Sequence, residues 1–469
     1  MSRILVISNR VQLPAEGGNG AQGGLAVALQ AALRDQGGLW FGWSGQTVDQ
    51  FDGAVHRTSV RGVTVATIDL EEQDVDEYYN GYANRTLWPL FHFRLGIAEF
   101  ERDFEGGYAR VNARFADSVV PMIEPDQRIW IHDYHLFPLG RQLRKRGVRN
   151  PLGFFLHIPW PPAELLQSLP NHRALVEALF DYDLVGFQTE DWRSNFHRCV
   201  TELLGGTVGD DGTVSVGARR IRTIACPIGI DAENFAELAG STKARYTHYR
   251  MRQSLAGRDM IVGVDRLDYS KGLEDRFQGY ERYLRANPAR HGEVFLLQIA
   301  PPSREDVASY QEIRAKLDAF SGRINGEFAD FDWVPLRYVN RGYPRDVLAG
   351  IYRTARVGLV TPLRDGMNLV AKEYVAAQDP SDPGVLILSE FAGAASQLRE
   401  AVLVNPHSPD ELADAIAQAL DMPRAERIRR WECLVDNVRH EDVTWWCKRF
   451  LDALGACSEE PVRMEMPTQ

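Results

Sequence analysis

The sequence predicts an α/β protein made of two doubly wound halves, each with a mainly parallel sheet, and a cleft between them. Short apolar runs alternate with helical patterns along the whole chain, as expected for parallel strands that helices cover on both faces. The alternation stops near residues 231–242 and then restarts. A chain of 469 residues is too long for a single ordinary hydrophobic core. We therefore expect one domain at residues 1–231 and another at residues 242–441.

The predicted strands are short and nearly continuously apolar. The first series is Ile4–Ser8, Ile129–His132, Gly153–His157, Leu184–Gln188 and Thr223–Pro227, and the second is Ile261–Val264, Val294–Ala300, Val357–Thr361 and Val385–Ser389. Helical stripes lie between them, for example Leu273, Phe277, Tyr280 and Leu284. The segment Asp442–Leu454 has the pattern of an amphipathic helix.

Composition excludes several classes of protein. The formal net charge of -11 argues against a nucleic-acid partner, which would favour a basic excess. Five cysteines without a CxxC pair disfavour a disulfide framework and a zinc site. Neither a signal peptide nor an apolar run of membrane-spanning length is present, so we expect a cytoplasmic protein that has no membrane partner.

A glycine-rich segment at residues 18–23 formally matches GxGxxG. A loop separates it from the first predicted strand, and the acidic residue that should end a second strand is missing, which disfavours a nicotinamide cofactor. Two interpretations remain. The segment is a flexible loop, or the amides of Gly23 and Gly24, just before a helix from Leu25, approach a diphosphate closely.

The segment 264–273 follows a predicted strand and begins a helix. It places Arg266 and Lys271 where the carboxyl end of a parallel strand presents its loop to a ligand. A guanidinium fork and an ammonium both suit a diphosphate leaving group. The alternative is that these are surface cations paired with Asp265 and Asp268.

The segment 361–374 repeats this arrangement of strand, turn and helix. Its turn lies at Asp365-Gly366, and unpaired amides at the helix start near Asn368 suit an anion. Glu373 lies further along the helix, at a distance that suits ribose hydroxyls. The alternative for Glu373 is a salt bridge with a neighbour such as Lys372.

Two further strand ends carry polar residues. Asp133 is a candidate anchor for sugar hydroxyls, and a metal site formed with His132 and His135 is disfavoured by the ligand spacing. His157 is either a structural histidine beside proline or a functional residue at the same sheet edge. We interpret the pairs Asp181/Asp183 and Asp330/Asp332 as structural. Spacing alone does not connect the scattered residues Arg10, Tyr79, Trp88 and Arg304.

Taken together, these motifs resemble bacterial trehalose-6-phosphate synthases, which are family 20 glycosyltransferases. The resemblance covers about residues 1–455. Its most specific stretches are Ser8-Asn-Arg10, Gly37-Gly-Leu-Trp-Phe-Gly-Trp43, Ile131-His-Asp-Tyr-His135, Arg266-Leu-Asp-Tyr-Ser-Lys-Gly272 and Val360–Tyr374. The chain departs from the family pattern in a longer loop at Ala15–Asn19, in Trp160 where phenylalanine is expected, and at Arg341–Tyr343.

The resemblance implies a GT-B architecture of two Rossmann-like domains, with the helix at about 442–455 packing back onto the first. It implies transfer of glucose from UDP-glucose to C1 of glucose 6-phosphate with retention of the α configuration. The products are α,α-trehalose 6-phosphate and UDP, in the first step of trehalose biosynthesis, which serves osmoprotection. It implies neither a metal nor another cofactor, and it is compatible with a homo-oligomer.

The resemblance also assigns site residues. Donor-site positions are Gly24, His157, Arg266, Lys271, Asp365, Met367, Asn368, Leu369 and Glu373. Acceptor-site positions are Arg10, Tyr79, Trp88, Asp133 and Arg304. The residues expected to act in catalysis are Asp133, His157, Arg266, Lys271 and Asp365.

Four other functions share part of this pattern. They are a synthase with another acceptor such as glycerol 3-phosphate, a pseudo-glycosyltransferase that joins cyclitols, a non-catalytic sugar-phosphate sensor, and a phosphorylase with pyridoxal phosphate. The four acceptor-phosphate positions favour glucose 6-phosphate, and the sequence contains no motif for pyridoxal phosphate. It does not distinguish UDP- from GDP- or ADP-glucose, because the base is commonly held by backbone groups.

Overall fold

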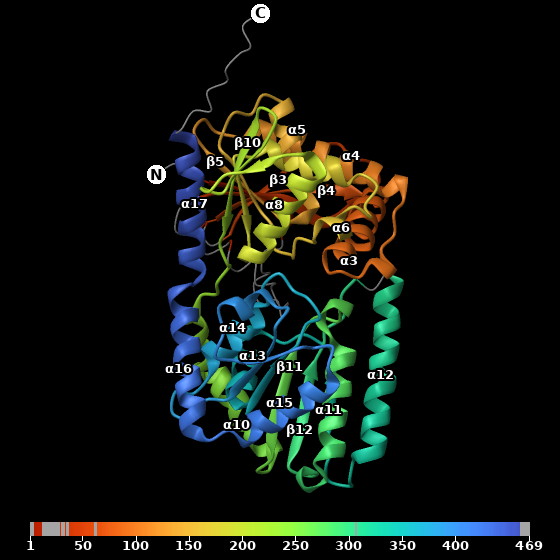
Figure 1. Cartoon of the computed structure of the whole chain (residues 1–469), viewed down its shortest axis with the longest axis vertical. Helices are drawn as coiled ribbons and strands as arrows, with labels where there is room; N and C mark the ends of the chain where they lie inside the picture. The colour runs from red at the N-terminus through yellow and green to blue at the C-terminus, as the bar shows by residue number, and fades with distance from the viewer. Residues whose placement is uncertain are drawn as a thin grey trace, which may run out of the picture. The chain divides into compact units, whose positions relative to one another are not determined.

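The computed structural model describes residues 4–11, 29, 33, 37–60, 63–304 and 307–459. These residues form two compact units, both drawn in Figure 1. Unit 1 comprises the described parts of Met1–Leu13, Leu29–Cys226 and Thr444–Gln469, and unit 2 comprises those of Pro227–Val443. Within the described ranges, no helix combines the length and apolar character needed to cross a membrane.

The described part of unit 1 is built on one ten-stranded sheet with the order β3-β4-β2-β1-β5-β6-β7-β10-β9-β8. The strands are β1 (Ile4–Arg10), β2 (Gly38–Val48), β3 (His56–Val60), β4 (Val63–Glu71), β5 (Arg128–His132), β6 (Leu152–Phe155), β7 (Leu184–Phe187), β8 (Thr207–Val208), β9 (Thr213–Val216) and β10 (Arg219–Ala225). The strands from β4 to β10 pair in parallel, whereas β3, β8 and β9 pair antiparallel at the edges. Because β2 and β5 flank β1, the strand order reverses there, which is where doubly wound sheets bind ligands.

Helices of unit 1 connect these strands. They are α2 (Glu72–Asp74), the π-helix η1 (Val75–Leu87), α3 (Trp88–Phe91), η2 (Leu95–Ile97), α4 (Arg102–Val119), η3 (Val120–Met122), η4 (Tyr134–Leu136), α5 (Leu139–Lys145), α6 (Ala163–Leu166), α7 (His172–Ala178), η5 (Leu179–Asp181) and α8 (Glu190–Leu204).

The C-terminal helix α17 (Val443–Glu459) enters unit 1 at Thr444. Its Phe450 ring stacks on Trp130 of β5, with ring centroids 4.8 Å apart. Glycines of the neighbouring strands make room for that ring, since a Cβ at Gly153 or Gly186 would lie within 2.8 Å of it. The amphipathic helix predicted at Asp442–Leu454 therefore forms and packs on this sheet through aromatic contacts.

The described part of unit 2 contains a six-stranded, wholly parallel sheet with the order β13-β12-β11-β14-β15-β16. The strands are β11 (Asp259–Val264), β12 (Val294–Ile299), β13 (Leu336–Val339), β14 (Val357–Val360), β15 (Val385–Ser389) and β16 (Val402–Val404). The order reverses between β11 and β14, so the loops after these two strands lie at the switch point.

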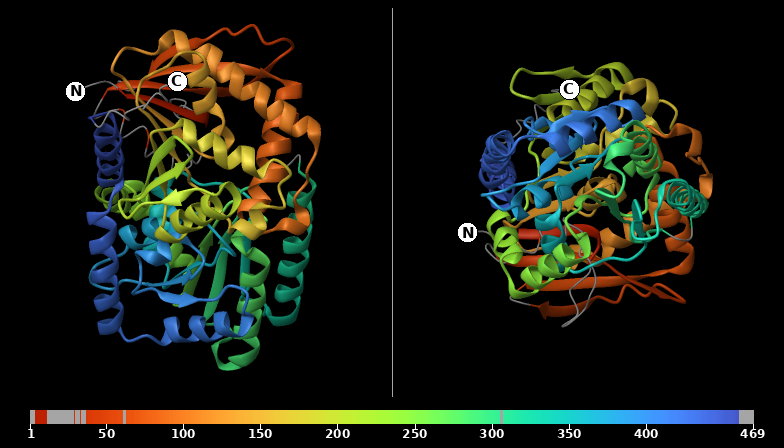
Figure 2. Two further views of the ribbon diagram at one scale, coloured as in Figure 1. Left: turned by 45° about the horizontal axis from the view of Figure 1, so that its top comes forward. Right: turned by 90° about the horizontal axis from the view of Figure 1, so that it is seen from below.

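The described part of unit 2 also contains helices. They are α9 (Ala232–Ala239), α10 (Thr242–Leu255), η6 (Tyr269–Lys271), α11 (Leu273–Ala286), η7 (Pro288–Arg290), α12 (Ala308–Phe328), α13 (Arg345–Thr354), α14 (Leu369–Ala377), η8 (Gly393–Ser396), α15 (Pro409–Asp421) and α16 (Arg424–His440). Helix α11 contacts α12 and α15, whereas α13 contacts α9, α10 and α14. Because connections between parallel strands are nearly always right-handed, we expect these two groups of helices on opposite faces of the sheet. Figure 2 shows helices around the strands.

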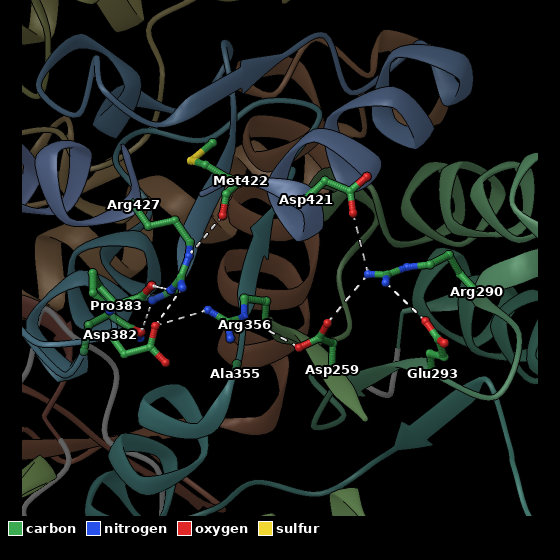
Figure 3. A network of polar contacts seen from close by, with 12 residues as sticks. Asp259, Arg290, Glu293, Ala355, Arg356, Asp382, Pro383, Asp421, Met422 and Arg427 are labelled. Atoms are coloured by element: carbon green, nitrogen blue, oxygen red, sulfur yellow. Dashed lines mark hydrogen bonds and ion pairs between the residues drawn. The ribbon is translucent and has the colours of Figure 1, made fainter. Parts of the chain in front are cut away.

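An ion network joins the amino ends of the unit 2 strands, at the edge opposite the switch-point loops (Figure 3). Arg356, just before β14, lies 3.6 Å from Asp259 at the start of β11 and 3.5 Å from Asp382. Arg427 of α16 donates to the same Asp382 oxygen at 2.7 Å and to the carbonyl of Pro383. Arg427 is only 7% exposed, and these contacts provide the partners that its buried charge requires.

The predicted fold class is confirmed, and all nine predicted strands form, with ends that shift by no more than four residues. The helical stripe Leu273, Phe277, Tyr280 and Leu284 is fully buried in α11. Three differences concern particular segments. Arg10 is the last residue of β1, His157 follows β6 by two residues, and α9 lies within the segment predicted as the break.

Candidate functional site

The loop after β11 is held tightly against the loop after β14. Gly272 adopts a left-handed φ of 65°, and a Cβ there would lie 2.4 Å from the carbonyl oxygen of Thr361. The amide of Leu363 donates to the carbonyl of Ser270 at 2.8 Å. The strand order of this sheet thus brings two segments, about ninety residues apart in sequence, into direct contact at one sheet edge.

A buried arginine fixes the floor beneath these loops. Arg276 has no exposed surface and donates to Asp265 at 2.6 Å, Gln298 at 2.8 Å and Thr361 at 3.0 Å. Burial raises the pKa of Asp265, and the Arg276 charge opposes that rise. Asp265 therefore pairs with Arg276, and the charge of the motif cation Lys271 also opposes the rise of its pKa.

Lys271 and Asp365 form an ion pair between the two loops, and both side chains are largely buried. Asp365 also accepts from the side-chain amide of Asn368 at 3.2 Å. Asn368 has a left-handed φ of 74° and caps α14, so the first amides of that helix face the same loop region. A cation and a helix start therefore lie on either side of one carboxylate.

The turn before α14 is close-packed. A Cβ on Gly393 would lie 1.9 Å from the carbonyl oxygen of Gly366, so only glycine fits beside the turn. Met367 is buried, and its carbonyl accepts from the amide of Ala394 at 2.9 Å. Leu369 is the first residue of α14 and is half-buried. This packing fixes the direction in which the start of α14 points.

Arg266 and Arg304 share one buried carboxylate. Asp268 lies 3.8 Å from Arg266 and 3.7 Å from Arg304, and its side chain has no exposed surface. It accepts from the Ser270 amide at 2.9 Å and from the Tyr310 hydroxyl at 3.2 Å. Burial alone would raise the pKa of Asp268, but the arginines and a nearby lysine hold it well below its usual range. The predicted alternative of an Arg266–Asp268 pair is therefore confirmed, although its carboxylate is buried.

Glu373 lies on α14 in an environment that disfavours its charge. Burial raises its pKa to about 7, and the charge of Arg345 opposes the rise. The neighbouring Lys372 donates to the carbonyl of Ile228 at 2.8 Å. A carboxyl group that titrates near neutral pH can both donate and accept hydrogen bonds.

In unit 1, Asp133 joins the ends of β5 and β6. It has a φ of 77°, its amide donates to the carbonyl of Phe155 at 2.8 Å, and its carboxylate accepts from the amide of His157 at 3.1 Å. The ring of His157 lies between His132, at 3.1 Å, and the side-chain amide of Gln188, at 3.2 Å. Burial lowers the pKa of His157 to about 3, so the imidazole is neutral.

Arg10 at the end of β1 lies over the Trp43 ring, with 5.3 Å from Cζ to the ring centroid. Trp43 in turn meets Tyr79 of η1 edge-on, with ring centroids 5.6 Å apart. Gly45 provides the space for the guanidinium, because a Cβ there would lie 2.3 Å from one of its nitrogens. The structure therefore connects Arg10 to Tyr79, which the sequence spacing could not do.

A second aromatic chain leads from Tyr79 to Trp88. Tyr79 stacks on His135 with centroids 5.9 Å apart, His135 contacts Tyr134 at 3.9 Å, and Tyr134 contacts Trp88 at 5.7 Å. Trp88 is buried at the start of α3. Arg10, Tyr79 and Trp88 are thus connected by one continuous chain of ring contacts, which is buried at its Trp88 end.

Sequence reasoning did not identify several residues that build these sites. Trp43 and His135 lay within recognised stretches, yet neither was singled out as a link in the aromatic chain. Arg276 on α11 and Tyr310 on α12 lie outside the recognised motifs. No residue spacing in the sequence indicated a role for either of them. Gly24 and the Ala15–Asn19 loop lie outside the described residues.

Comparison with known proteins places the chain in a family. The model of a family described as Glycosyltransferase family 20 matches residues 5–456. The trehalose-6-phosphate synthase of Sinorhizobium fredii is 48% identical over 462 residues, which are 98% of this chain and 99% of that protein.

Two solved structures are also similar. The α,α-trehalose-phosphate synthase (UDP-forming) of Burkholderia xenovorans, in complex with glucose-6-phosphate, has a TM-score of 0.94 and 47% identity, with 97% of this chain and 100% of that chain covered. An E. coli structure bound with UDP-2-fluoro glucose has a TM-score of 0.92 and 47% identity, with 97% and 99% covered.

Proposed function

The chain belongs to glycosyltransferase family 20, and on that basis we propose that it transfers glucose from UDP-glucose to glucose 6-phosphate, forming trehalose 6-phosphate and UDP. The observation that carries this proposal is the paired loop structure at the β11/β14 switch point. There Lys271, Asp365 and the start of α14 form a preorganised site that suits a diphosphate and an adjoining sugar.

We assign the donor diphosphate to the cations and helix start of unit 2. Negative charge develops on the diphosphate as the bond to the anomeric carbon breaks. Lys271, Arg266 and the amides near Asn368 stabilise that charge, because fixed dipoles and cations in a partly buried site need little reorganisation. Met367 in the turn and Leu369 at the first position of α14 hold the start of the helix in place for this contact.

We assign the sugar and ribose hydroxyls of the donor to polar side chains. Asp365 accepts from both Lys271 and Asn368, an arrangement that suits an acceptor for sugar hydroxyls better than a nucleophile. Because the imidazole of His157 is neutral, it interacts with sugar hydroxyls through hydrogen bonds and not through a charge. Glu373, with its pKa near neutral, is assigned to the ribose hydroxyls. Gly24 keeps its assignment to the donor by resemblance alone.

The phosphate of the acceptor is assigned to arginines. Arg304, held beside Asp268, binds that phosphate, and Arg10 has the same role in unit 1. Tyr79 supplies a half-buried ring, which suits the apolar face of a sugar ring, and the buried Trp88 keeps its assignment to the acceptor site by resemblance. Asp133, fixed by the β6 backbone, is assigned to hydroxyls near the reacting carbon.

Retention of configuration follows from attack on the same face from which the diphosphate leaves. In this mechanism the donor phosphate assists removal of the acceptor proton, so no carboxylate nucleophile is required. Since protein cations neutralise the leaving group, the reaction needs no divalent metal.

The test is a direct assay of nucleoside-diphosphate release by the purified chain. UDP-, GDP- and ADP-glucose are each offered with glucose 6-phosphate, and UDP-glucose also with glycerol 3-phosphate. We expect release of UDP with glucose 6-phosphate, unchanged by EDTA, and an α,α linkage in the product by NMR. No release with any donor would reject the proposal, and loss of release with EDTA would reject its metal-free part.

A further inference from the structure

The contact between Asp268 and two arginines has a consequence for how the two substrates are bound. Arg266 is assigned to the donor diphosphate and Arg304 to the acceptor phosphate, yet both guanidinium groups lie within 3.8 Å of one carboxylate oxygen. At this separation the ion pairs are longer than hydrogen bonds. The carboxylate therefore orients both guanidinium groups by charge, while a phosphate can form the shorter contacts.

Two hydrogen bonds fix Asp268 itself. One oxygen accepts from the backbone amide of Ser270, and the other accepts from the hydroxyl of Tyr310, which is 1% exposed. Neither donor is free to rotate away, because Ser270 belongs to η6 and Tyr310 is packed in α12 against Tyr269. The carboxylate therefore has a single position relative to both loops.

Tyr310 reaches Arg304 directly as well. Its hydroxyl accepts from a guanidinium nitrogen of Arg304, whose Cζ lies 5.6 Å from the Tyr310 ring centroid. Arg304 also has a left-handed φ of 52°, a strained conformation for a side chain with a Cβ. Its position therefore depends on partners that hold it, and Tyr310 contacts it through both hydroxyl and ring.

We propose that Asp268 and Tyr310 are positioning residues for the two phosphate-binding arginines. Asp268 orients both, whereas Tyr310 contacts Arg304 directly and reaches Arg266 only through Asp268. This inference rests on the proposed function, since it takes the two arginines to bind different substrates. It predicts that substitution of Tyr310 weakens mainly acceptor binding, whereas substitution of Asp268 weakens the binding of both substrates.

Tyr310→Phe removes the hydroxyl and keeps the ring. We expect the KM for glucose 6-phosphate to rise roughly tenfold, the value of one hydrogen bond to a charged group, and the KM for UDP-glucose to change less than about twofold. Asp268→Asn should raise both KM values, because both arginines lose the same counter-charge. Tyr280→Phe is the matched control: it removes a buried hydroxyl bond, to the Pro335 carbonyl at 3.0 Å, in the same unit.

A double-mutant cycle separates positioning from general structure. If Tyr310 acts through Arg304, then Tyr310→Phe has no further effect on the KM for glucose 6-phosphate in an Arg304→Ala background. A tyrosine that only supports the fold would add its full effect in both backgrounds. If Asp268→Asn does not fold, Tyr310→Phe and the cycle decide the question without it.

Two results would overturn the inference: a Tyr310→Phe enzyme that matches the Tyr280→Phe control for both substrates, or one that weakens both substrates equally. Failure of the proposed function is recognised separately, because wild-type enzyme would then release no UDP and this inference would fall with it. Wild-type turnover with an unaffected Tyr310→Phe enzyme rejects the positioning roles alone.

Discussion

Lys271 and Asp365 form an ion pair that joins the loop after β11 to the loop after β14. These residues are 94 positions apart in the sequence, and only the reversal of strand order between the two strands makes them neighbours. The same contact places a lysine beside the start of α14. The ion pair is therefore the structural basis for assigning a diphosphate to this part of unit 2.

Lys271→Met keeps much of the side-chain length and removes the charge. We expect kcat to fall about 10²- to 10³-fold, because charge on the departing diphosphate loses its cation. The assay is steady-state UDP release. Lys243→Met, which removes an exposed lysine from α10, is the control and should leave kcat unchanged. A drop in kcat shared by both variants would contradict the assignment.

Arg304→Ala should raise the KM for glucose 6-phosphate by about 10- to 100-fold, since a charge-assisted contact to the acceptor phosphate is lost. Binding of UDP, measured by calorimetry, should remain close to that of the wild type. Equal weakening of UDP and glucose 6-phosphate would show that Arg304 does not distinguish the two ligands.

Gly45→Ala tests the place of Arg10. The new methyl group would overlap the Arg10 guanidinium, so the KM for glucose 6-phosphate should rise several-fold. Gly53→Ala is the matched control, because Gly53 has a similar left-handed φ of 73° but only a distant ring atom at 4.0 Å. Both variants carry backbone strain, so a KM effect confined to Gly45→Ala is the expected result. If the two variants have the same KM for glucose 6-phosphate, the assignment of Arg10 to the acceptor is wrong.

Glu373 should make stability depend on pH. Its folded pKa of about 7 lies above the unfolded value near 4.5, so folding favours the protonated form. That contribution is fully present below about pH 4.5 and is lost as pH rises towards 7 and beyond. In Glu373→Gln this loss is absent, so the variant should gain thermal stability relative to wild type between pH 5 and pH 8. Parallel profiles for the two proteins would contradict the raised pKa.

Most of the strands that could be predicted have both faces buried, and β10 is the exception. Strands such as β11 and β12 read as continuous apolar runs, because helices cover both sides. The edge strand β13 was missed because three of its four residues are partly exposed, and β16 because it has only three residues. In β2, glycines and polar residues at its end hide the strand pattern.

The sequence could place candidate residues at strand ends, but it could not predict the contacts that they make. Arg266, Lys271 and Asp365 each follow a recognisable strand, so their position at a carboxyl edge could be predicted. Their partners depend on strand order and on side chains from helices, which local sequence does not encode. The clearest case is Tyr310, whose contact with Asp268 arises only when α12 packs beside η6.

The most direct test of the account is a crystal structure of this chain with UDP and glucose 6-phosphate. We predict that the UDP diphosphate lies within hydrogen-bonding distance of Arg266, Lys271 and an amide at the start of α14, and that the hexose phosphate contacts Arg304. A diphosphate bound away from both Arg266 and Lys271 would contradict the central claim, whatever the enzyme's activity.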